Sequence, residues 1–447
     1  AKAGKLRSIS GLGEKTEQNI LHSIELSKKR GGRMLLGYAA DIAEEIIKEL
    51  KKTPIEKINV AGSIRRGRET IGDIDILVTS GKPKDVIDFF TKMKFVGDVI
   101  AKGSTKASIH LNSGTQVDLR VLPPKEYGSA LMYFTGSKEH NVELRRIAIA
   151  KRLKLSEYGL IKQSTKGASG SGDKFVAGRN EEEVYKALDM QYIEPEIREN
   201  RGEIELAQKR KLPKLIGYGD ILGDLQMHTK WSDGVNTVEE MAIAAKDIGY
   251  KYICITDHIG KLMIANAMDE KKIEKQRKEI DSVNKKVVGI TVLQGGEIDI
   301  RADGSLDVKN NVLEKLDIVL ASLHSAFKNN GTGRILKTME NPNVDIIAHP
   351  SGRLIDKREG ADLDLGKIID KSKETGTILE IDAQPERTDL NDINTKAAIE
   401  AGCKLAIDTD AHSAEQLRYM RMGITTARRG WAKKNAIINT QPLEKML

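Results

Sequence analysis

The chain has 447 residues, a net charge of +8, 31% charged residues and only 4% aromatic residues. Its two cysteines, Cys254 and Cys403, exclude a disulfide scaffold and a cysteine-based zinc ribbon, and they suit a reducing compartment. No apolar run approaches the ~18 residues that a membrane span needs, and the N-terminus has no apolar signal-peptide core. At ~150 residues per domain, we expect about three domains in a soluble, cytoplasmic protein. The first residue is Ala1 rather than Met, so we expect a processed chain or a fragment.

The positive charge is concentrated in the first part of the chain. Lys and Arg outnumber Asp and Glu by 13 over residues 1–180, whereas residues 181–212 carry a net charge of −3 and residues 213–447 a net charge of −2. Such clustering indicates a polyanionic partner such as nucleic acid. A basic surface without a partner has the same composition, so charge alone leaves both interpretations open.

The pattern of apolar residues divides the first 212 residues into helical and strand-rich regions. Apolar residues at helical spacing predict helices, and short alternating runs predict strands. A stretch rich in Gly, Ser and Lys predicts a loop, and a polar, charged stretch predicts an interdomain linker. In chain order we predict helices in 1–55, strands within 56–125 (clearest at Val60, 74–78 and 116–121), helices in 126–160, a loop at 164–178, an acidic helix at 181–189 and the linker at 194–211.

After Leu212, short β-type runs alternate with helical segments. Seven strand–helix units in the remaining residues predict a parallel α/β barrel. Cys254 lies within one of these runs and Cys403 directly before another, so we expect both cysteines in the core. The expected strands are 224–227, 252–256, 292–294, 318–322, 344–348, 377–381 and 404–408.

Three carboxylates in the strand-rich region fall on two strands with matching patterns. Asp73 and Asp75 are two residues apart, so both side chains leave the same face of one strand. Asp118 occupies the corresponding face of the run Gln116–Val121. If the strands are adjacent, three like charges meet and require neutralising cations. Two Mg²⁺ ions would neutralise them and would clamp an in-line phosphoryl displacement. The alternative is that these acids are turn residues on an exposed sheet edge.

The residues before these acids suit a phosphate. Gly62 and Ser63 lie on a predicted strand-to-helix turn, which offers backbone N–H groups to an anion. Arg66 would add a charge-assisted contact to the same anion.

This constellation resembles the nucleotidyltransferase superfamily, and the run Tyr133-Phe134-Thr135-Gly136-Ser137-Lys138-Glu139-His140-Asn141 resembles the signature of the family X DNA polymerases, the family of DNA polymerase beta. The resemblance implies that the aromatic pair lines the deoxyribose of the incoming nucleotide and that Asn141 contacts its base. It also implies that Arg145 contacts the template strand. By the same resemblance, Asp73 and Asp75 bind both metals, Asp118 binds the catalytic metal, and Gly62, Ser63, Arg66 and Gly136 surround the nucleotide.

The run Ser10–Thr16 resembles a helix-hairpin-helix turn, in which Gly11 and Gly13 let the backbone approach a DNA phosphate. A glycine-bounded turn between two packed helices is the structural alternative. The resemblance to family X covers residues 1–212 almost throughout. Family members begin with a separate lyase-type domain and earlier helical hairpins, so we expect this chain to be a truncated or isolated part of such a protein.

Five of the eight histidines lie after residue 212, and each follows a predicted strand. Because the carboxyl ends of barrel strands converge on one mouth, imidazoles and carboxylates there predict a multinuclear site for Zn²⁺, Mn²⁺ or Fe²⁺. A single histidine in a core is more often structural, but five at equivalent strand ends are not explained that way. Arg353 and Arg387 also follow strand ends, where we expect ordinary surface arginines although either would suit a phosphate.

This half resembles the polymerase and histidinol phosphatase (PHP) domain, a seven-stranded barrel that is associated with Mn²⁺-dependent 3′–5′ exonuclease activity when fused to family X polymerases. The resemblance implies nine ligand positions, of which eight carry the usual residue type. Position 226 departs from the family, which normally has His there, because a Gln amide is a weak neutral ligand. Asp382 is another departure, since Asn is commoner there. The implied ligand positions are Gln226, His228, Asp233, His258, Glu297, His324, His349, Asp410 and His412.

We therefore expect an α/β multidomain enzyme: a nucleotidyltransferase-type polymerase core followed by a seven-stranded PHP barrel. It would add dNMP to a primer 3′-hydroxyl with Mg²⁺, and its barrel would trim 3′ ends with Mn²⁺ or Zn²⁺ unless Gln226 impairs it. The expected partners are primer-template or gapped DNA and dNTP, with no membrane, in a prokaryotic cytoplasm at the nucleoid. The alternatives are a polymerase with a purely structural barrel and a non-catalytic DNA-binding scaffold. The expected parts are fingers at 1–55, palm at 56–125, thumb at 126–193, linker at 194–212 and the PHP barrel at 213–447.

Overall fold

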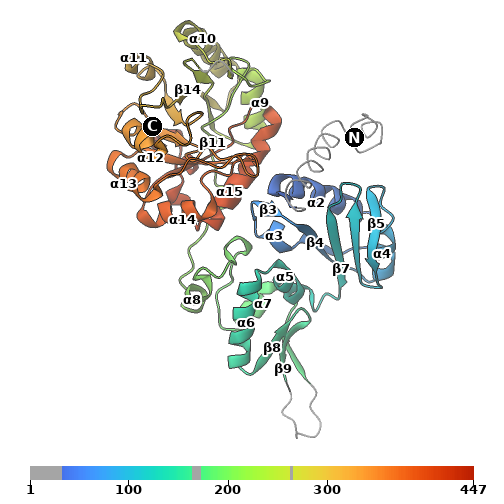
Figure 1. Cartoon of the computed structure of the whole chain (residues 1–447). Helices are drawn as coiled ribbons and strands as arrows, with labels where there is room; N and C mark the ends of the chain where they lie inside the picture. The colour runs from blue at the N-terminus through green and yellow to red at the C-terminus, as the bar shows by residue number, and fades with distance from the viewer. Residues whose placement is uncertain (1–32, 164–172, 262–264, 447) are drawn as a thin grey trace. The chain divides into compact units, whose positions relative to one another are not determined.

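The computed structural model describes residues 33–163, 173–261 and 265–446, and the chain divides into two compact units, residues 1–212 and 213–447. Figure 1 shows the elements of each unit. Gly11 and Gly13, the residues of the expected helix-hairpin-helix turn, lie outside the described residues. Within the described ranges, no helix combines the length and the apolar character that crossing a membrane requires.

The first unit is built on a five-stranded mixed sheet with the strand order β2-β4-β7-β6-β5. Strands β4 and β7 are parallel, and the other neighbours are antiparallel. Apolar residues of one sheet face pack on helices α2 and α4. Strands β1 and β3 form a separate, short antiparallel pair. The elements are β1 (Met34–Leu35), α2 (Leu36–Leu50), β2 (Lys57–Val60), α3 (Gly62–Arg65), β3 (Thr70–Ile71), β4 (Asp73–Thr79), α4 (Pro83–Phe90), β5 (Val96–Lys102), β6 (Lys106–Leu111) and β7 (Gln116–Leu122).

Alternation in β4 and β7 fixes which face of the sheet is apolar. Ile74 and Ile76 are fully buried, and Val117 and Leu119 of β7 are fully buried beside them. The polar residues between them therefore leave the opposite face of the sheet. The three strands that we expected most clearly in this region are confirmed.

The next region differs in part from the expectation of helices over 126–160. Two helices are followed by a three-stranded antiparallel sheet of order β10-β9-β8, and β10 falls in the segment that we expected to be loop. Leu155, Leu160 and Ala177 lie side by side across this sheet and are buried, which explains why the short, Lys-rich strands form. The elements are α5 (Tyr127–Thr135), α6 (Lys138–Ala150), β8 (Leu153–Ser156), β9 (Gly159–Lys162), β10 (Lys174–Ala177) and α7 (Glu181–Ala187).

Residues 194–212, which we expected to be a linker, are folded into the first unit. They contain a 3₁₀ helix, η1 (Pro195–Ile197), and helix α8 (Glu203–Gln208). Arg198 and Glu203 are fully buried because each has an oppositely charged or hydrogen-bonding partner in the unit, Glu181 for Arg198 and His140 for Glu203. Charged composition suggested solvent exposure here, but pairing makes burial of these side chains possible.

The second unit is a nearly closed barrel of seven parallel strands in the order β11-β12-β14-β15-β16-β17-β18, which confirms the expected architecture. A short additional strand, β13, pairs with β14. Figure 1 shows the helices of this unit around the strands. The strands are β11 (Gly223–Asp224), β12 (Tyr252–Ile255), β13 (His258–Ile259), β14 (Thr291–Asp299), β15 (Ile318–Ser322), β16 (Ile346–Ala348), β17 (Ile378–Asp382) and β18 (Leu405–Asp408). The helices are α9 (Val238–Ile248), α10 (Glu270–Lys286), α11 (Asn310–Leu313), α12 (Gly331–Thr338), α13 (Leu365–Thr375), α14 (Asp392–Ala401), α15 (Met420–Arg429) and α16 (Leu443–Met446).

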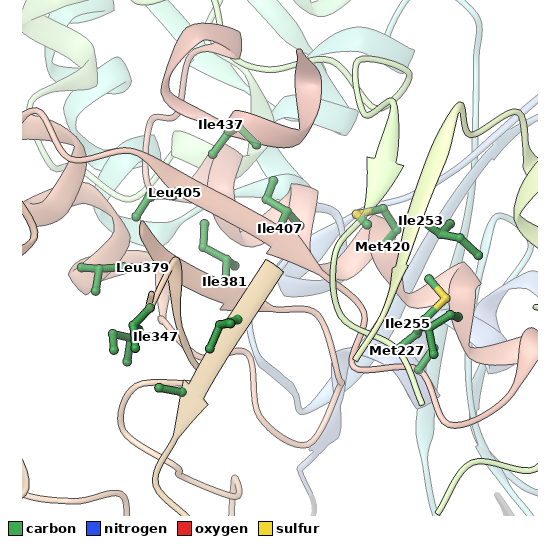
Figure 2. Close-up of a cluster of buried hydrophobic side chains, with 14 of the residues drawn as sticks. Met227, Ile253, Ile255, Ile347, Leu379, Ile381, Leu405, Ile407, Met420 and Ile437 are labelled. Atoms are coloured by element: carbon green, nitrogen blue, oxygen red, sulfur yellow. The ribbon is translucent and has the colours of Figure 1, made fainter. Parts of the chain in front are cut away.

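Strand residues alternate between two apolar clusters. Ile253 and Ile255 of β12 belong to the larger cluster, whereas Tyr252 and Cys254 belong to a second, smaller one. Figure 2 shows part of the larger cluster, with Ile381, Ile407 and Met420 among its members. Both cysteines are free and buried, as expected.

Polar side chains connect the first and last barrel strands. The Thr409 hydroxyl donates to Asp224 Oδ2 at 2.5 Å, and Leu225 N–H donates to Asp408 Oδ1 at 2.8 Å. Asn439 Nδ2 donates to the carbonyls of Gly223 (2.9 Å) and Ile407 (2.6 Å). These bonds satisfy buried backbone groups at the seam, and they fix the strand ends from which site residues project.

Candidate functional site

The first candidate site lies on β4 and β7. Parallel pairing places Asp75 directly opposite Asp118 and Asp73 opposite Gln116. Asp118 is held by neighbours on its own sheet, since Ser108 Oγ donates to one carboxylate oxygen and Gln116 Nε2 donates to the other at 3.1 Å. The strand register therefore brings together the three acids that the sequence pattern singled out.

The pKa of Asp75 reflects its burial and the negative charge of the neighbouring aspartates. Burial, followed by repulsion from Asp73 and Asp118, raises the pKa of Asp75 to about 7. Among the described residues, sets of three or more ligand atoms that all lie within 4.8 Å of one another occur in the second unit. The three palm carboxylates do not form such a set, so their oxygens are spaced more widely than this. Like charges without a counterion separate, and a divalent ion would both lower this pKa and draw the oxygens together.

The turn before β4 is pressed against Asp75. Gly62 has a φ of +60°, and a Cβ at this position would lie 2.4 Å from Asp75 Oδ2. Ala61 N–H donates to the Asp75 carbonyl at 2.8 Å. Any residue with a side chain at position 62 would displace the carboxylate, so a glycine is required here. Ser63 follows it on α3 and is half-buried.

Arg66 closes the turn and contacts two distant segments. Its Nη1 donates to the Thr135 carbonyl, and its Nε lies 3.1 Å from Glu199 Oε1. It also lowers the pKa of Asp75, so its positive charge acts on the carboxylate cluster. Gly136 is adjacent, because a Cβ there would lie 3.1 Å from Arg66 Nη1.

The aromatic pair of the nine-residue run lies at the end of α5. The rings of Tyr133 and Phe134 meet edge to face with centroids 5.1 Å apart, and the Arg120 guanidinium lies 4.2 Å above the Phe134 ring. Asn141 Nδ2 donates to the Tyr133 carbonyl at 2.7 Å. Arg145 lies half-buried on α6. Since Arg120 is on β7, it connects the aromatic pair to the strand that carries Asp118.

The second candidate site lies where the barrel strands end. Three groups of side chains place their ligand atoms within 4.8 Å of one another, and neighbouring groups share residues. Their chemistry, imidazole nitrogen with carboxylate oxygen, suits Mn²⁺, Fe²⁺ or Zn²⁺. The groups are His228, Asp233, His258 and His412; His258, Glu297 and His324; and His228, Glu297 and Asp410.

Glu297 is at the centre of this site. Its Oε1 lies 3.0 Å from His349 Nε2 and 3.2 Å from His324 Nε2. Its Oε2 lies 3.3 Å from His228 Nε2 and 3.1 Å from Gln226 Nε2. One carboxylate thus reaches four of the residues that the family resemblance implied as ligand positions.

Asp233 and Asp410 contact the remaining histidines. Asp233 Oδ2 lies 3.4 Å from His412 Nε2 and 3.7 Å from His258 Nε2, and Asp410 Oδ1 lies 3.0 Å from His228 Nε2. The His228 ring stacks between those of His258 and His412, with centroid distances of 4.6 and 4.3 Å. All eight residues of the usual ligand types, together with Gln226, therefore lie in one cluster.

In this cluster acids and imidazoles compensate each other. Although burial acts to raise it, the pKa of Glu297 lies well below its usual value because of His258 and His324. Burial opposes the imidazolium form of His324, but Glu297 and Asp299 raise its pKa to about 9. Burial lowers the pKa of His258 to about 4. At an imidazole whose pKa is raised, such as His324, metal binding would displace a proton.

Gln226 is fully buried and points its amide nitrogen at the central carboxylate of this cluster. Its Nε2 donates to Glu297 at 3.1 Å, and its buried Oε1 has no hydrogen-bond partner among the residues that the structure describes. An amide N–H that points at Glu297 cannot ligate a metal, and it occupies a lone pair of the central carboxylate. That Gln226 weakens one metal position stays a prediction.

Sequence reasoning missed several buried polar residues around the barrel site. Arg387 is not a surface arginine: its side chain is 17% exposed, and its Nε lies 3.3 Å from Asp382 Oδ2 and 3.6 Å from Asp410 Oδ2. Glu380 Oε2 accepts the backbone N–H of His349 at 2.6 Å. Glu380 and Asp382 both lie on the inward-facing side of β17. The alternation of polar and apolar residues along this strand was therefore the signal that could have shown their burial.

Comparisons with known proteins agree with this geometry. Family models for the DNA polymerase beta palm, the DNA polymerase beta thumb and the PHP domain match residues 37–123, 130–199 and 224–360. The DNA polymerase/3′-5′ exonuclease PolX of Bacillus subtilis (strain 168) is 39% identical over an alignment that covers 98% of this chain and 77% of that protein.

Two further relatives match smaller parts of the chain. A probable phosphatase of Thermoanaerobacter pseudethanolicus is 28% identical over 48% of this chain and 89% of its own length. DNA polymerase lambda of Rattus norvegicus is 28% identical over 31% of this chain and 28% of its own length. Because palm, thumb and barrel are all matched and one relative aligns with nearly the whole chain, this protein belongs to the family X DNA polymerases that carry a PHP domain.

Proposed function

We propose that the chain is a template-directed DNA polymerase that transfers a deoxynucleotide from dNTP to a primer 3′-hydroxyl and releases pyrophosphate. The observation that carries the proposal is the register of β4 and β7, which pairs Asp75 with Asp118 beside Asp73. Three acids on one sheet face, next to a glycine turn and an arginine, suit a nucleoside triphosphate with its divalent ions. When bound, two Mg²⁺ ions would supply Lewis-acid stabilisation of the attacking and leaving oxygens.

The residues of this site have distinct roles in the proposal. Asp73 and Asp75 would hold both ions, and Asp118 would hold the one that activates the primer 3′-hydroxyl. The Gly62–Ser63 turn and Arg66 bind the triphosphate tail, with Gly136 allowing the close approach of Arg66. Tyr133 and Phe134 line the sugar, Asn141 contacts the base, Arg145 contacts the template, and Gly11 and Gly13 bind a DNA backbone phosphate.

Primer extension tests this function. A labelled primer on a gapped duplex, with dNTP and Mg²⁺, should lengthen with the wild-type chain and should not lengthen with Asp118→Asn. Equal extension by both proteins would contradict the proposal. Binding to the duplex should also weaken steeply as salt increases, because phosphate contacts release counterions.

We further propose that the barrel hydrolyses the terminal 3′ phosphodiester of DNA. The supporting observation is the overlap of three metal-ligand groups through His228, His258 and Glu297. Bound ions, Mn²⁺ or Zn²⁺, would supply an activated water and polarise the phosphodiester. Glu297, His324 and Asp410 would hold these ions, and Arg387 holds the second oxygen of Asp410.

Shortening of a labelled 3′ end in Mn²⁺, with no dNTP present, tests the barrel activity. If metal analysis finds the loaded barrel and no shortening occurs, the barrel is structural. If neither lengthening nor shortening occurs while the duplex is bound, the chain is a DNA-binding scaffold. We propose DNA as the partner for both activities, dNTP as the substrate of the polymerase alone, and the bacterial cytoplasm, at the nucleoid, as the location.

A further inference from the structure

Glu199, in the segment that composition suggested was a linker, contacts the arginine of the nucleotide turn. Its Oε1 accepts from Arg66 Nε at 3.1 Å, and its Oε2 lies 3.9 Å from Arg68 Nη1. The side chains of Arg66 and Glu199 are only 14% and 11% exposed. A carboxylate 133 residues away in sequence therefore fixes one edge of the Arg66 guanidinium, while the Thr135 carbonyl fixes another.

The backbone around Glu199 is itself held firmly in the first unit. The Arg198 carbonyl accepts the Ser137 N–H at 3.0 Å. The Arg198 guanidinium is fully buried, pairs with Glu181 Oε1 at 2.6 Å, and lies 5.4 Å from the ring centroids of Tyr185 and Tyr192. Glu199 thus projects from a rigid point next to the run that contains Gly136 and Ser137.

The same segment supports a second residue of that run. Glu203 Oε1 lies 2.7 Å from His140 Nδ1, and the Tyr185 hydroxyl lies 2.9 Å from His140 Nε2. The backbone N–H groups of Asn200 and Arg201 donate to Glu203 at 2.8 and 2.6 Å. Residues 198–203 therefore brace the nucleotide-binding run from behind, at both Ser137 and His140.

We propose that Glu199 is a positioning residue for the triphosphate tail of the incoming nucleotide, acting by orienting Arg66; this rests on the proposed polymerase function. A long arginine side chain loses considerable rotamer freedom when it is ordered. Contacts to Glu199 and Thr135 order the Arg66 side chain before the nucleotide binds. The entropy cost of ordering Arg66 therefore does not reduce the free energy of nucleotide binding. Removing the carboxylate should weaken nucleotide binding and leave the chemical step unchanged, because Glu199 touches neither reacting atom.

Steady-state primer extension with three substitutions at position 199 tests this role. We expect Glu199→Ala to raise the KM for dNTP about tenfold, with kcat within about twofold of wild type. Glu199→Asp, which withdraws the carboxylate by one methylene, should raise KM about fivefold. Glu199→Gln keeps an oxygen acceptor at the same reach and should stay within about twofold. Glu205→Ala, an exposed glutamate of α8, is the matched control and should not change KM.

Inhibition by inorganic pyrophosphate gives a readout that a merely structural role would not change. Its inhibition constant should rise by the same factor as the dNTP KM in Glu199→Ala, because pyrophosphate occupies the tail site alone. In an Arg66→Ala background, adding Glu199→Ala should change KM less than twofold, because the residue that it orients is gone.

The inference is overturned if Glu199→Ala and Glu199→Asp both keep the wild-type KM, if Glu199→Gln behaves like Glu199→Ala, or if kcat falls in place of affinity. Thermal unfolding of each variant identifies any that misfolds, and Glu199→Asp then decides the question. Failure of the wild-type chain to extend a primer would instead contradict the proposed function, so the two failures are distinguishable.

Discussion

The palm and the barrel assemble acidic residues in opposite electrostatic ways. In the palm, three aspartates from two adjacent strands share one sheet face with arginines nearby, and the pKa of Asp75 is raised to about 7 by burial and by its acidic neighbours. In the barrel, Glu297, Asp233 and Asp410 are interleaved with five histidines. There the pKa of Asp233 is lowered to about 2, although burial opposes this, because His412 and His228 favour the charged carboxylate.

This difference indicates how each site would use metal. The palm carries uncompensated negative charge, so divalent ions and the arginine side chains must supply the balance, and ions can arrive with each nucleotide. In the barrel the pKa values of His228, His324 and His412 are raised by neighbouring carboxylates, so bound ions would replace protons at these imidazoles. Substitutions and pH changes should therefore affect the two sites differently.

The largest expected effect separates the two activities at the palm. Asp118→Asn removes one charge from the ion-binding face, and residues that act as a unit lose most of the rate together. We expect primer extension to fall at least about a thousandfold. Trimming of a 3′ end in Mn²⁺ should stay within about twofold of wild type. Parallel loss of both activities would contradict two independent sites.

The reciprocal substitution is Glu297→Gln in the barrel. Because Glu297 belongs to two of the three ligand groups, its loss should reduce 3′ trimming about a thousandfold and should lower the metal content of the isolated protein. Primer extension should be unchanged. Retained metal with full trimming would show that Glu297 does not hold the ions.

The palm should also limit the stability of the metal-free protein. Since the folded pKa of Asp75 (about 7) exceeds the unfolded value (3.8), its contribution to stability is complete below pH 3.8 and is lost as pH rises through about 7. At pH 8 in EDTA, Asp75→Asn should therefore stabilise the first unit by about 3 kcal/mol, measured by chemical denaturation. Saturating Mg²⁺ should shrink this difference, and an unchanged or lower stability in EDTA would contradict it.

The smallest effect concerns Gln226. Gln226→His replaces an amide N–H donor with an imidazole acceptor beside Glu297. We expect about a tenfold rise in metal affinity or in 3′ trimming, the range typical of changes around metal sites. Primer extension serves as the control. If wild-type trimming is as fast as that of Gln226→His, position 226 does not limit the barrel.

The sequence predicted elements whose pattern is local. Period-two alternation placed Asp73 and Asp75 on one face of β4, and the strand–helix rhythm after Leu212 predicted the seven barrel strands. The adjacency of β4 and β7, on which the palm site depends, remained an assumption until the register was seen. Alternation specifies a face of a strand, but the choice of neighbour depends on long-range packing.

The segments that were predicted wrongly all depend on contacts with residues that are distant in sequence. Strand β10 lies in a Gly- and Ser-rich stretch and forms because it completes the sheet with β9 and β8. Arg198, Glu203 and Arg387 have surface-type composition but are buried because each meets an opposite charge or a hydrogen-bonding partner. A single sequence does not reveal such pairing.

Anomalous scattering from Mn²⁺ in a crystal of the chain with primer-template DNA and a non-hydrolysable dNTP tests the account most directly. We predict two peaks about 3.5–4 Å apart, both within ligand distance of Asp73 and Asp75, one also contacted by Asp118, with Arg66 on the triphosphate. Bound nucleotide with no peak among these three carboxylates would contradict the account.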